Sequence, residues 1–245
     1  MQRQIVFVAP EGTRELFRRL VAALEEEILP CYHDMKLLPP GRPLADWTLA
    51  GEVDALQASV EAGGLETFDL VGYSGGAAVS LAFAAANPAR IRSLTLIEPP
   101  WSGNDLWGEE EREFVQEFDA LVMLPPAALV TAFFELFAPG AAVPLPSEEE
   151  RVARMAEALR MVWQGYRAAA LARSRLAGIS VPVYLPVGAR STTRMAAQAE
   201  MLASIFPRAR VEIVAGRHHF DLLLREAATL AGGLSAIWGE DKDAL

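Results

Sequence analysis

A serine stands in a spacing that is typical of a catalytic nucleophile. Residues 72–76 read Gly-Tyr-Ser-Gly-Gly, which places Ser74 at the centre of a Gly-x-Ser-x-Gly pattern. An apolar run precedes the pattern and a small-residue helical sequence follows it, as expected when a serine sits on a sharp strand-to-helix turn. Gly72 and Gly76 fit such a turn because neighbouring backbone approaches closely there. The alternative is a glycine-rich turn that carries an inert serine.

A serine hydroxyl also needs a base that takes its proton and a group that orients that base. The chain has three histidines, at positions 33, 218 and 219. His33 lies in a weakly predicted strand and is interpreted as a surface or packing residue. His218 and His219 follow the last strand-like run and fall at its carboxyl end. The sequence therefore favours one of this pair as the base.

Apolar runs alternate with helical periodicity, which predicts an α/β fold with a mostly parallel sheet of about six strands and helices on both faces. Strands are predicted over residues 5–8, 32–38, 68–71, 91–97, 181–188 and 210–214. The first helix is predicted to end at Pro30, residues 39–41 to form a turn, and one last helix to run through Trp238. Ligands bind beyond the carboxyl ends of parallel strands, so residues that follow strands become site candidates.

Residues 101–178 lack strand-like runs and read as a helical insertion rich in aromatic side chains. The expected domains are therefore a core formed by residues 1–100 and 179–245 and an insertion over 101–178. If the insertion covers Ser74, the substrate pocket is apolar and aromatic. Tyr73, Trp101 and Arg190 are predicted to line it, and Arg190 or Arg217 is a candidate partner for a substrate carboxylate.

Composition excludes several classes of partner and site. The formal net charge of −10 and pI of about 4.9 argue against binding to nucleic acid or to an anionic membrane. No apolar run is long enough to cross a bilayer, and the N-terminal run is too short for a signal peptide, which favours a cytoplasmic location. Cys31 alone cannot form an intrachain disulfide and is interpreted as a packing residue. No metal set or dinucleotide fingerprint is present, so no cofactor is expected; a homodimer stays open.

The chain resembles the α/β-hydrolase superfamily over nearly its whole length. Its nucleophile motif matches residues 72–76, and the serine-then-histidine order is the order of that family. Residues 215–220, Ala-Gly-Arg-His-His-Phe, resemble the family ending Gly-x-Gly-His-Phe, which implies that His219 is the base. The insertion resembles the helical cap of many members. The resemblance also implies an oxyanion hole made by the backbone N–H groups of Gly75 and Glu11.

The acid departs from the commonest family pattern. Many members carry Asp shortly after the strand that ends here near residue 188, yet residues 188–192 read Gly-Ala-Arg-Ser-Thr. Some lipases instead place the acid before proline at the end of the preceding strand, where this chain has Glu98 and Pro99. Glu98 is therefore the candidate acid. Asp221, close to His219, and a dyad without an acid are the alternatives.

The resemblance implies a serine hydrolase that cleaves a small, hydrophobic carboxylic ester, thioester or lactone through an acyl-enzyme at Ser74. A second departure bears on this expectation. The family usually carries His-Gly before the first oxyanion donor, and the matching residues here are Ala9 and Pro10. Proline has no N–H to donate. A non-catalytic protein that binds a small molecule in the same pocket, or a non-hydrolytic enzyme such as a lyase, is the alternative.

Overall fold

A computed structural model describes residues 2–35, 47–105 and 108–239, and within them six strands form one parallel sheet. The order across the sheet is β2-β1-β3-β4-β5-β6, and every neighbouring pair is parallel. The strands are β1 (Arg3–Ala9), β2 (Ile28–Asp34), β3 (Phe68–Tyr73), β4 (Ile91–Ile97), β5 (Val183–Gly188) and β6 (Ala209–Val214). The predicted fold class is confirmed.

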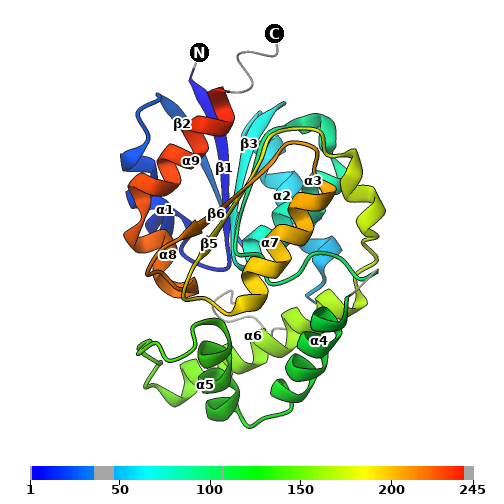
Figure 1. Ribbon diagram of the computed structural model, residues 1–245, viewed down its shortest axis with the longest axis vertical. Helices are drawn as coiled ribbons and strands as arrows, with labels where there is room; N and C mark the ends of the chain where they lie inside the picture. The colour runs from blue at the N-terminus through cyan, green and yellow to red at the C-terminus, as the bar shows by residue number, and fades with distance from the viewer. Residues whose placement is uncertain (1, 36–46, 106–107, 240–245) are drawn as a thin grey trace.

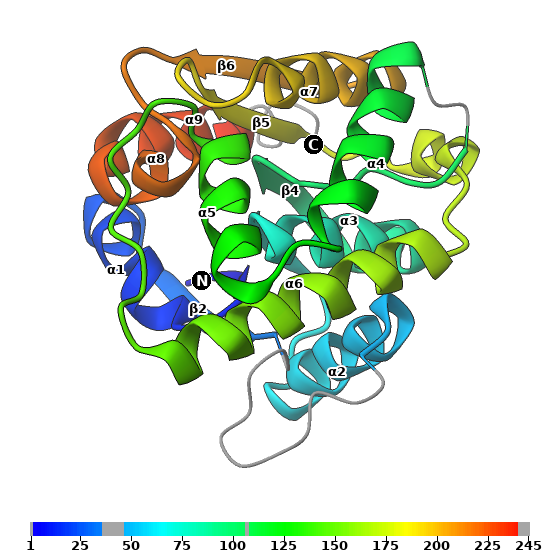
Figure 2. The same ribbon diagram turned by 90° about the horizontal axis from the view of Figure 1, so that it is seen from below.

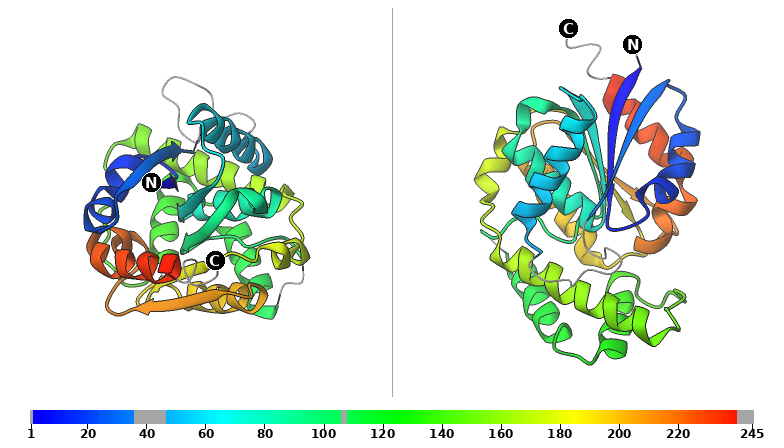
Figure 3. Two further views of the ribbon diagram at one scale, coloured as in Figure 1. Left: turned by 90° about the horizontal axis from the view of Figure 1, so that it is seen from above. Right: turned by 180° about the vertical axis from the view of Figure 1, so that it is seen from behind.

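Helices cover both faces of the sheet, as Figures 1 and 3 show. One face carries α1 (Thr13–Ala23), α8 (His219–Arg225) and α9 (Ala227–Gly239). The other carries α2 (Leu49–Ala62), α3 (Gly75–Ala86) and α7 (Thr193–Ile205). Strands β1, β3, β4 and β5 are almost continuously buried, because both of their faces meet helices.

Three further helices, called the cap helices below, lie beyond the carboxyl ends of the strands (Figures 1 and 2). They are α4 (Glu109–Leu121), α5 (Pro126–Phe137) and α6 (Glu149–Ala168). All three fall within the predicted insertion, between β4 and β5. The chain then returns to the sheet through the short helix η2 (Arg173–Gly178), which contacts α3; another short helix, η1 (Pro88–Arg90), leads into β4.

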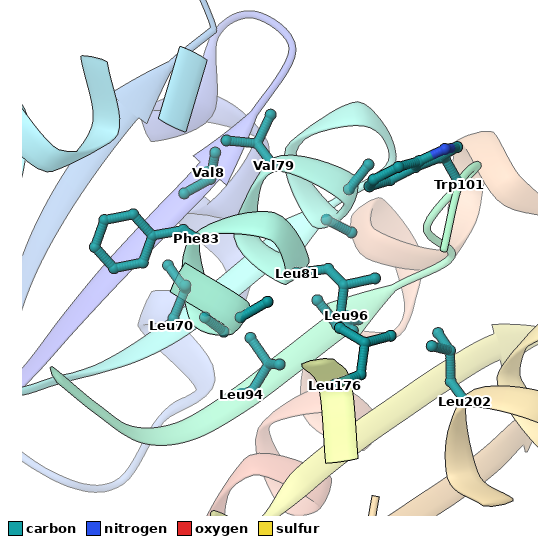
Figure 4. Close-up of a cluster of buried hydrophobic side chains, with 14 of the residues drawn as sticks. Val8, Leu70, Val79, Leu81, Phe83, Leu94, Leu96, Trp101, Leu176 and Leu202 are labelled. Carbon is teal, nitrogen blue, oxygen red and sulfur yellow. The ribbon is translucent and has the colours of Figure 1, made fainter. Parts of the chain in front are cut away.

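The larger apolar core lies between α3 and the sheet and is shown in Figure 4. Sheet residues such as Leu70 and Leu94 meet Val79, Leu81 and Phe83 of α3. The opposite face has its own core beneath α1, α8 and α9, which includes the fully buried Trp238. Burial on both sides holds the strand ends at fixed positions, and those ends carry the candidate site.

The predicted boundaries of two elements are wrong. Pro30 does not end the first helix, because α1 stops at Ala23 and Pro30 lies inside β2. Strand β2 forms one edge of the sheet, and an edge strand tolerates a residue without an N–H. The predicted last helix is two helices, α8 and α9, separated at Glu226. Residues 36–38 of the predicted second strand and the predicted turn at 39–41 lie outside the described residues.

No helix in the described ranges is both long enough and apolar enough to span a bilayer.

Candidate active site

Ser74 sits at the junction between β3 and α3, in a left-handed backbone conformation with φ 53° and ψ −125°. The junction is tight. A Cβ on Gly72 would lie 2.6 Å from the carbonyl oxygen of Gly76, and a Cβ on Gly76 would overlap the carbonyl of Val8 in β1. The predicted close approach of backbone is therefore present at both glycines. The tight junction turns the chain sharply from β3 into α3 and leaves Ser74 at the edge of the sheet.

Ser74, His219 and Glu98 form a continuous chain of hydrogen bonds. Nε2 of His219 lies 3.0 Å from Oγ of Ser74, and Nδ1 lies 2.8 Å from Oε2 of Glu98. His219 and Glu98 are both buried. Because a carboxylate only accepts hydrogen bonds, Nδ1 carries the imidazole proton and Nε2 is left to accept the hydroxyl proton of Ser74. The three side chains thus have the arrangement that activates a serine.

Glu98 is held by two donors besides His219. The backbone N–H of Gly188 lies 2.8 Å and the hydroxyl of Ser191 lies 2.5 Å from its other oxygen, Oε1. Glu98 itself has a φ of 48°, and it and Ser74 are the two non-glycine residues with positive φ among those the structure describes. Such a conformation costs about 1–3 kcal/mol and persists only where the surroundings enforce it. Both strained residues belong to the same hydrogen-bonded chain.

Asp221, the alternative acid, has a different task. Its Oδ1 accepts a hydrogen bond from the backbone N–H of His218 at 2.8 Å, which caps the start of α8. His218 also faces its own helix, since its Nδ1 accepts from the backbone N–H of Phe220. The capping of α8 by these two residues sets His219 as its first residue.

Tyr73 packs against His219. Its ring stacks on the imidazole of His219 with a centroid distance of 5.4 Å, and its hydroxyl donates to the backbone carbonyl of His219 at 2.9 Å. Burial, together with the nearby charges of Glu98 and Asp221, raises the pKa of Tyr73, so the hydroxyl stays protonated as a donor. Phe137 packs against the imidazole at a centroid distance of 5.1 Å, and Phe220 meets it edge-on at 4.9 Å.

A cavity of about 280 Å³ opens above Ser74 and His219. Its walls come mainly from the loop after β1, the junction of β3 with α3, the start of α8 and the cap helices, with one residue each from α1 and from the segment after β4. Most wall residues are apolar or aromatic, and the cap contributes Phe114, Phe118, Phe133, Phe134, Phe137, Met155, Ala158, Leu159, Val162, Trp163 and Tyr166. The lining includes no Lys or Arg, so the cavity suits a neutral apolar group.

Two of the predicted pocket residues do not line this cavity. Trp101 is buried outside it, where its ring stacks on Tyr166 with a centroid distance of 5.6 Å. Arg190 is exposed, because residues 188–191 turn away from the sheet after β5. Arg217 is also outside and pairs with Glu226. Tyr73 is the one member of the predicted set that reaches the cavity.

Both residues expected to supply the oxyanion donors, Gly75 and Glu11, line the cavity. Gly75 is the first residue of α3, whose opening N–H groups have no partner within the helix. Pro10 and Glu11 line the cavity at the end of β1. Pro10 has no N–H, which leaves Glu11 as the donor that this loop offers.

His33, by contrast, is a buried packing residue and not a surface one. Its two ring nitrogens lie 2.9 Å from Oγ of Ser59 and from Oε1 of Glu52, and Glu52 also accepts from the indole of Trp47. This network joins β2 to α2, and its residues do not line the cavity. In the described ranges, no three His, Cys, Asp or Glu side chains are grouped so that they could hold a metal ion.

Sequence reasoning missed two polar residues of the site. Ser191 lies in the very segment that was searched for a carboxylate, and it holds the carboxylate supplied by Glu98 instead. Tyr166 is one of the many aromatic residues of the predicted insertion, and its hydroxyl lies beside Gly75. The hydroxyl of Ser191, within residues 188–192, is the sequence signal for a partner that holds a carboxylate from another strand.

Comparison with known proteins adds an independent line of evidence. A family model described as "Alpha/beta hydrolase family" matches residues 10–232. Comparison of the sequence with curated proteins found no match.

Solved structures with the same fold include a bacterial membrane phospholipase A, MenH from S. aureus and the carboxylesterase CesB from Bacillus subtilis. The phospholipase has a TM-score of 0.75 and 18% identity, covering 98% of this chain and 80% of the other. MenH has 0.72 and 16%, with coverages of 98% and 94%. CesB has 0.65 and 17%, with coverages of 97% and 84%. At such identities the structures share the fold alone, whereas the family model spans nearly the whole sequence: the chain belongs to the α/β-hydrolase family.

Proposed function

We propose that the protein is a serine hydrolase that cleaves a small, hydrophobic carboxylic ester, thioester or lactone through an acyl-enzyme at Ser74. The observation that carries this proposal is the chain of hydrogen bonds from Ser74 through His219 to Glu98, with links of 3.0 and 2.8 Å, at the floor of an apolar cavity. Burying two polar side chains beside a serine with a strained backbone lowers the stability of the fold. A catalytic role gives this arrangement a reason that stability alone does not.

In the proposed reaction, Oγ of Ser74 attacks the carbonyl carbon while Nε2 of His219 takes the hydroxyl proton. Glu98 accepts from Nδ1 and stabilises the imidazolium that forms. The backbone N–H groups of Gly75 and Glu11 hold the negative oxygen of the tetrahedral intermediate. His219 then returns the proton to the departing alcohol or thiol. Water then attacks the acyl carbon while His219 takes its proton, the bond from Oγ of Ser74 to the acyl carbon breaks, and His219 returns the proton to Oγ as the acid leaves.

The size and lining of the cavity support a small apolar acyl or alcohol group. About 280 Å³ lies at the lower end of the range for ligand pockets, and its cap walls are hydrocarbon and aromatic rings. Glu11 is the one acidic residue among those that line the cavity, and its carboxylate would repel an anionic substrate. We therefore expect neutral esters, such as p-nitrophenyl butyrate, to be better substrates than esters that carry a carboxylate.

Labelling with a fluorophosphonate probe tests the proposal directly. The wild-type protein should become covalently labelled, and Ser74→Ala should not. His219→Gln, which keeps the serine but removes its base, should label far more slowly. A folded wild-type protein that neither labels nor hydrolyses any neutral p-nitrophenyl ester would overturn the proposal.

One observation favours a second candidate function, a protein that binds a small molecule without hydrolysing it. Pro10 occupies the loop that faces the position of the oxyanion, and it removes one possible N–H donor from that loop. Loss of one oxyanion donor costs about 10²–10³ in kcat. In a binding protein, small apolar molecules would quench the fluorescence of Trp163, which lines the cavity, and Ser74→Ala would leave that binding unchanged.

A further inference from the structure

Tyr166 of α6 brings a hydroxyl to the first residue of α3. Its Oη lies 3.5 Å from the carbonyl oxygen of Gly75, and a Cβ on Gly75 would come within 3.4 Å of it. Tyr166 lines the same cavity as Ser74 and Gly75. The hydroxyl of a cap helix therefore stands beside Gly75, the residue whose N–H is the proposed oxyanion donor.

The contact between Tyr166 and Gly75 is a weak hydrogen bond. O–H···O bonds in proteins are usually about 2.7–2.8 Å long, and a 3.5 Å separation leaves most of the interaction unused. The hydroxyl can therefore turn to a stronger acceptor at little cost. The oxygen of a tetrahedral intermediate carries a full negative charge, and hydrogen bonds to charged acceptors are about twice as strong as neutral ones.

The ring of Tyr166 is fixed by two tryptophans. Trp101 stacks on it at 5.6 Å with an interplanar angle of 11°, and Trp47 meets it edge-on at 5.8 Å. Tyr166 is buried, and burial, with the nearby charge of Glu52, raises the pKa of its hydroxyl. The ring is thus held in place and the hydroxyl keeps its proton, so that only rotation about the C–O bond is needed to direct the O–H to the oxyanion.

We propose that Tyr166 is a third oxyanion donor, supplied by the cap, which compensates for Pro10 in the loop after β1. In the reaction, the substrate carbonyl oxygen becomes negative as Ser74 attacks, and the Tyr166 hydroxyl donates a hydrogen bond to it. The proton stays on Tyr166, and no bond of the tyrosine forms or breaks. This inference rests on the proposed hydrolase function.

Tyr166→Phe keeps the ring between Trp101 and Trp47 and removes only the hydroxyl. With p-nitrophenyl butyrate, kcat should fall by about a hundredfold while KM changes by less than about threefold, because the lost bond exists only in the transition state. The affinity for phenylboronic acid, which forms a tetrahedral adduct with an activated serine, should fall in parallel. End-point labelling with fluorophosphonate counts the competent serines, so kcat is expressed per active site even if part of the variant is unfolded.

Tyr184→Phe is the matched control. Tyr184 is also buried, but its hydroxyl donates to Glu212 at 2.6 Å in a different part of the sheet, so its loss should leave kcat and boronate affinity unchanged. The Tyr166 proposal is overturned if Tyr166→Phe keeps kcat within about threefold of wild type. If wild type neither labels nor hydrolyses, it is the hydrolase function itself that fails, and the role of Tyr166 with it.

Discussion

At the scale of single residues, the acid is the group whose identity the fold decides. Glu98 follows β4, whereas Ser191 follows β5, and the two side chains meet at 2.5 Å. The hydroxyl of Ser191 and the N–H of Gly188 surround the Glu98 oxygen that does not face His219. The proposed acid thus comes from one strand end and is held by the next, which directs its other oxygen toward His219.

Replacing Glu98 with Gln tests this assignment. An amide at this position can present an N–H to Nδ1 of His219, which forces the imidazole into the tautomer that cannot accept from Ser74. We expect kcat for p-nitrophenyl butyrate to fall by about 10³–10⁴, with little change in KM. Asp221→Asn is the control, and its kcat should stay within about tenfold of wild type because Asp221 caps α8. Equal losses in the two variants would reject Glu98 as the acid.

The candidate residues that the structure brings together are those whose positions are encoded locally in the sequence. Ser74 is marked by two glycines, and His219 by its place after the last strand. Glu98 required a comparison with the family, because its partner is 121 positions away. Trp101 and Arg190 are predicted to line the pocket, but neither lines the cavity above Ser74. The direction of a loop side chain depends on tertiary packing, which no short sequence pattern encodes. Tyr166 was hidden for the same reason.

At the scale of elements, the close packing of α3 against β1 positions Ser74. Gly76 touches the backbone of Val8 and Ala9, so any side chain there must push α3 away from the sheet. Helix α3 is buried along nearly its whole length, which leaves no room for that movement. The glycine thus allows the close contact that carries Ser74 to the edge of the sheet.

We therefore expect Gly76→Ala to lower the free energy of unfolding by about 3 kcal/mol or more, the upper range for an overpacked core. Gly232→Ala is the matched control. Gly232 lies exposed in α9 with no atom near its missing Cβ, so an alanine should stabilise that helix by up to about 1 kcal/mol. Urea unfolding followed by circular dichroism measures both. A Gly76→Ala variant as stable as wild type would show that α3 can shift without cost.

Helix α6 forms a wall of the cavity, and substitutions on its two faces test where the acyl chain of a substrate lies. Ala158 lines the cavity, whereas Ala153, five residues earlier, is exposed. Ala158→Leu should reduce kcat/KM for p-nitrophenyl hexanoate much more than for p-nitrophenyl acetate, since the added methyl groups occupy space that the longer chain needs. One methylene in such a pocket changes binding by about 1–3 kcal/mol, so a shift of at least tenfold is expected. Ala153→Leu should leave the ratio unchanged; a shift there would place the acyl group elsewhere.

The elements also differ in how far their sequences determine them. The helices α4, α5 and α6 follow their apolar stripes, and β1, β3 and β4 follow continuous apolar runs. Strand β2 was misjudged because Pro30 normally breaks an element, and its place at the sheet edge is a property of the whole sheet. Element type was therefore readable from the sequence, whereas the start of β2 depended on tertiary structure.

At the scale of the whole molecule, the site lies where three parts of the chain converge: the strand ends, the turn into α3 and the cap helices. The solved structures named above keep this fold at 16–18% identity. That conservation of architecture explains why the fold class could be read from alternating patterns alone. The substrate depends on the cavity walls, and those come mainly from the cap, where the sequence pattern specifies helices but not which side chains face Ser74.

Stability of the whole molecule should fall steeply in alkaline solution, because burial raises the pKa of three tyrosines, Tyr73, Tyr166 and Tyr184, above the ordinary value of 10. Below about pH 10 both the folded and the unfolded chain hold these protons, and the stability is fully present. Above it the unfolded chain loses protons that the folded chain keeps, so the free energy of unfolding drops as pH rises through the folded pKa values.

Each of these three tyrosines contributes up to about 1.4 kcal/mol per pH unit to this loss of stability, or about 4 kcal/mol per pH unit for the three. Urea unfolding at about pH 8, 10 and 11 should show this slope, and Tyr184→Phe should reduce it by about a third, since one of three linked protons is gone. An unchanged slope in that variant would mean that Tyr184 ionises equally readily in the folded protein.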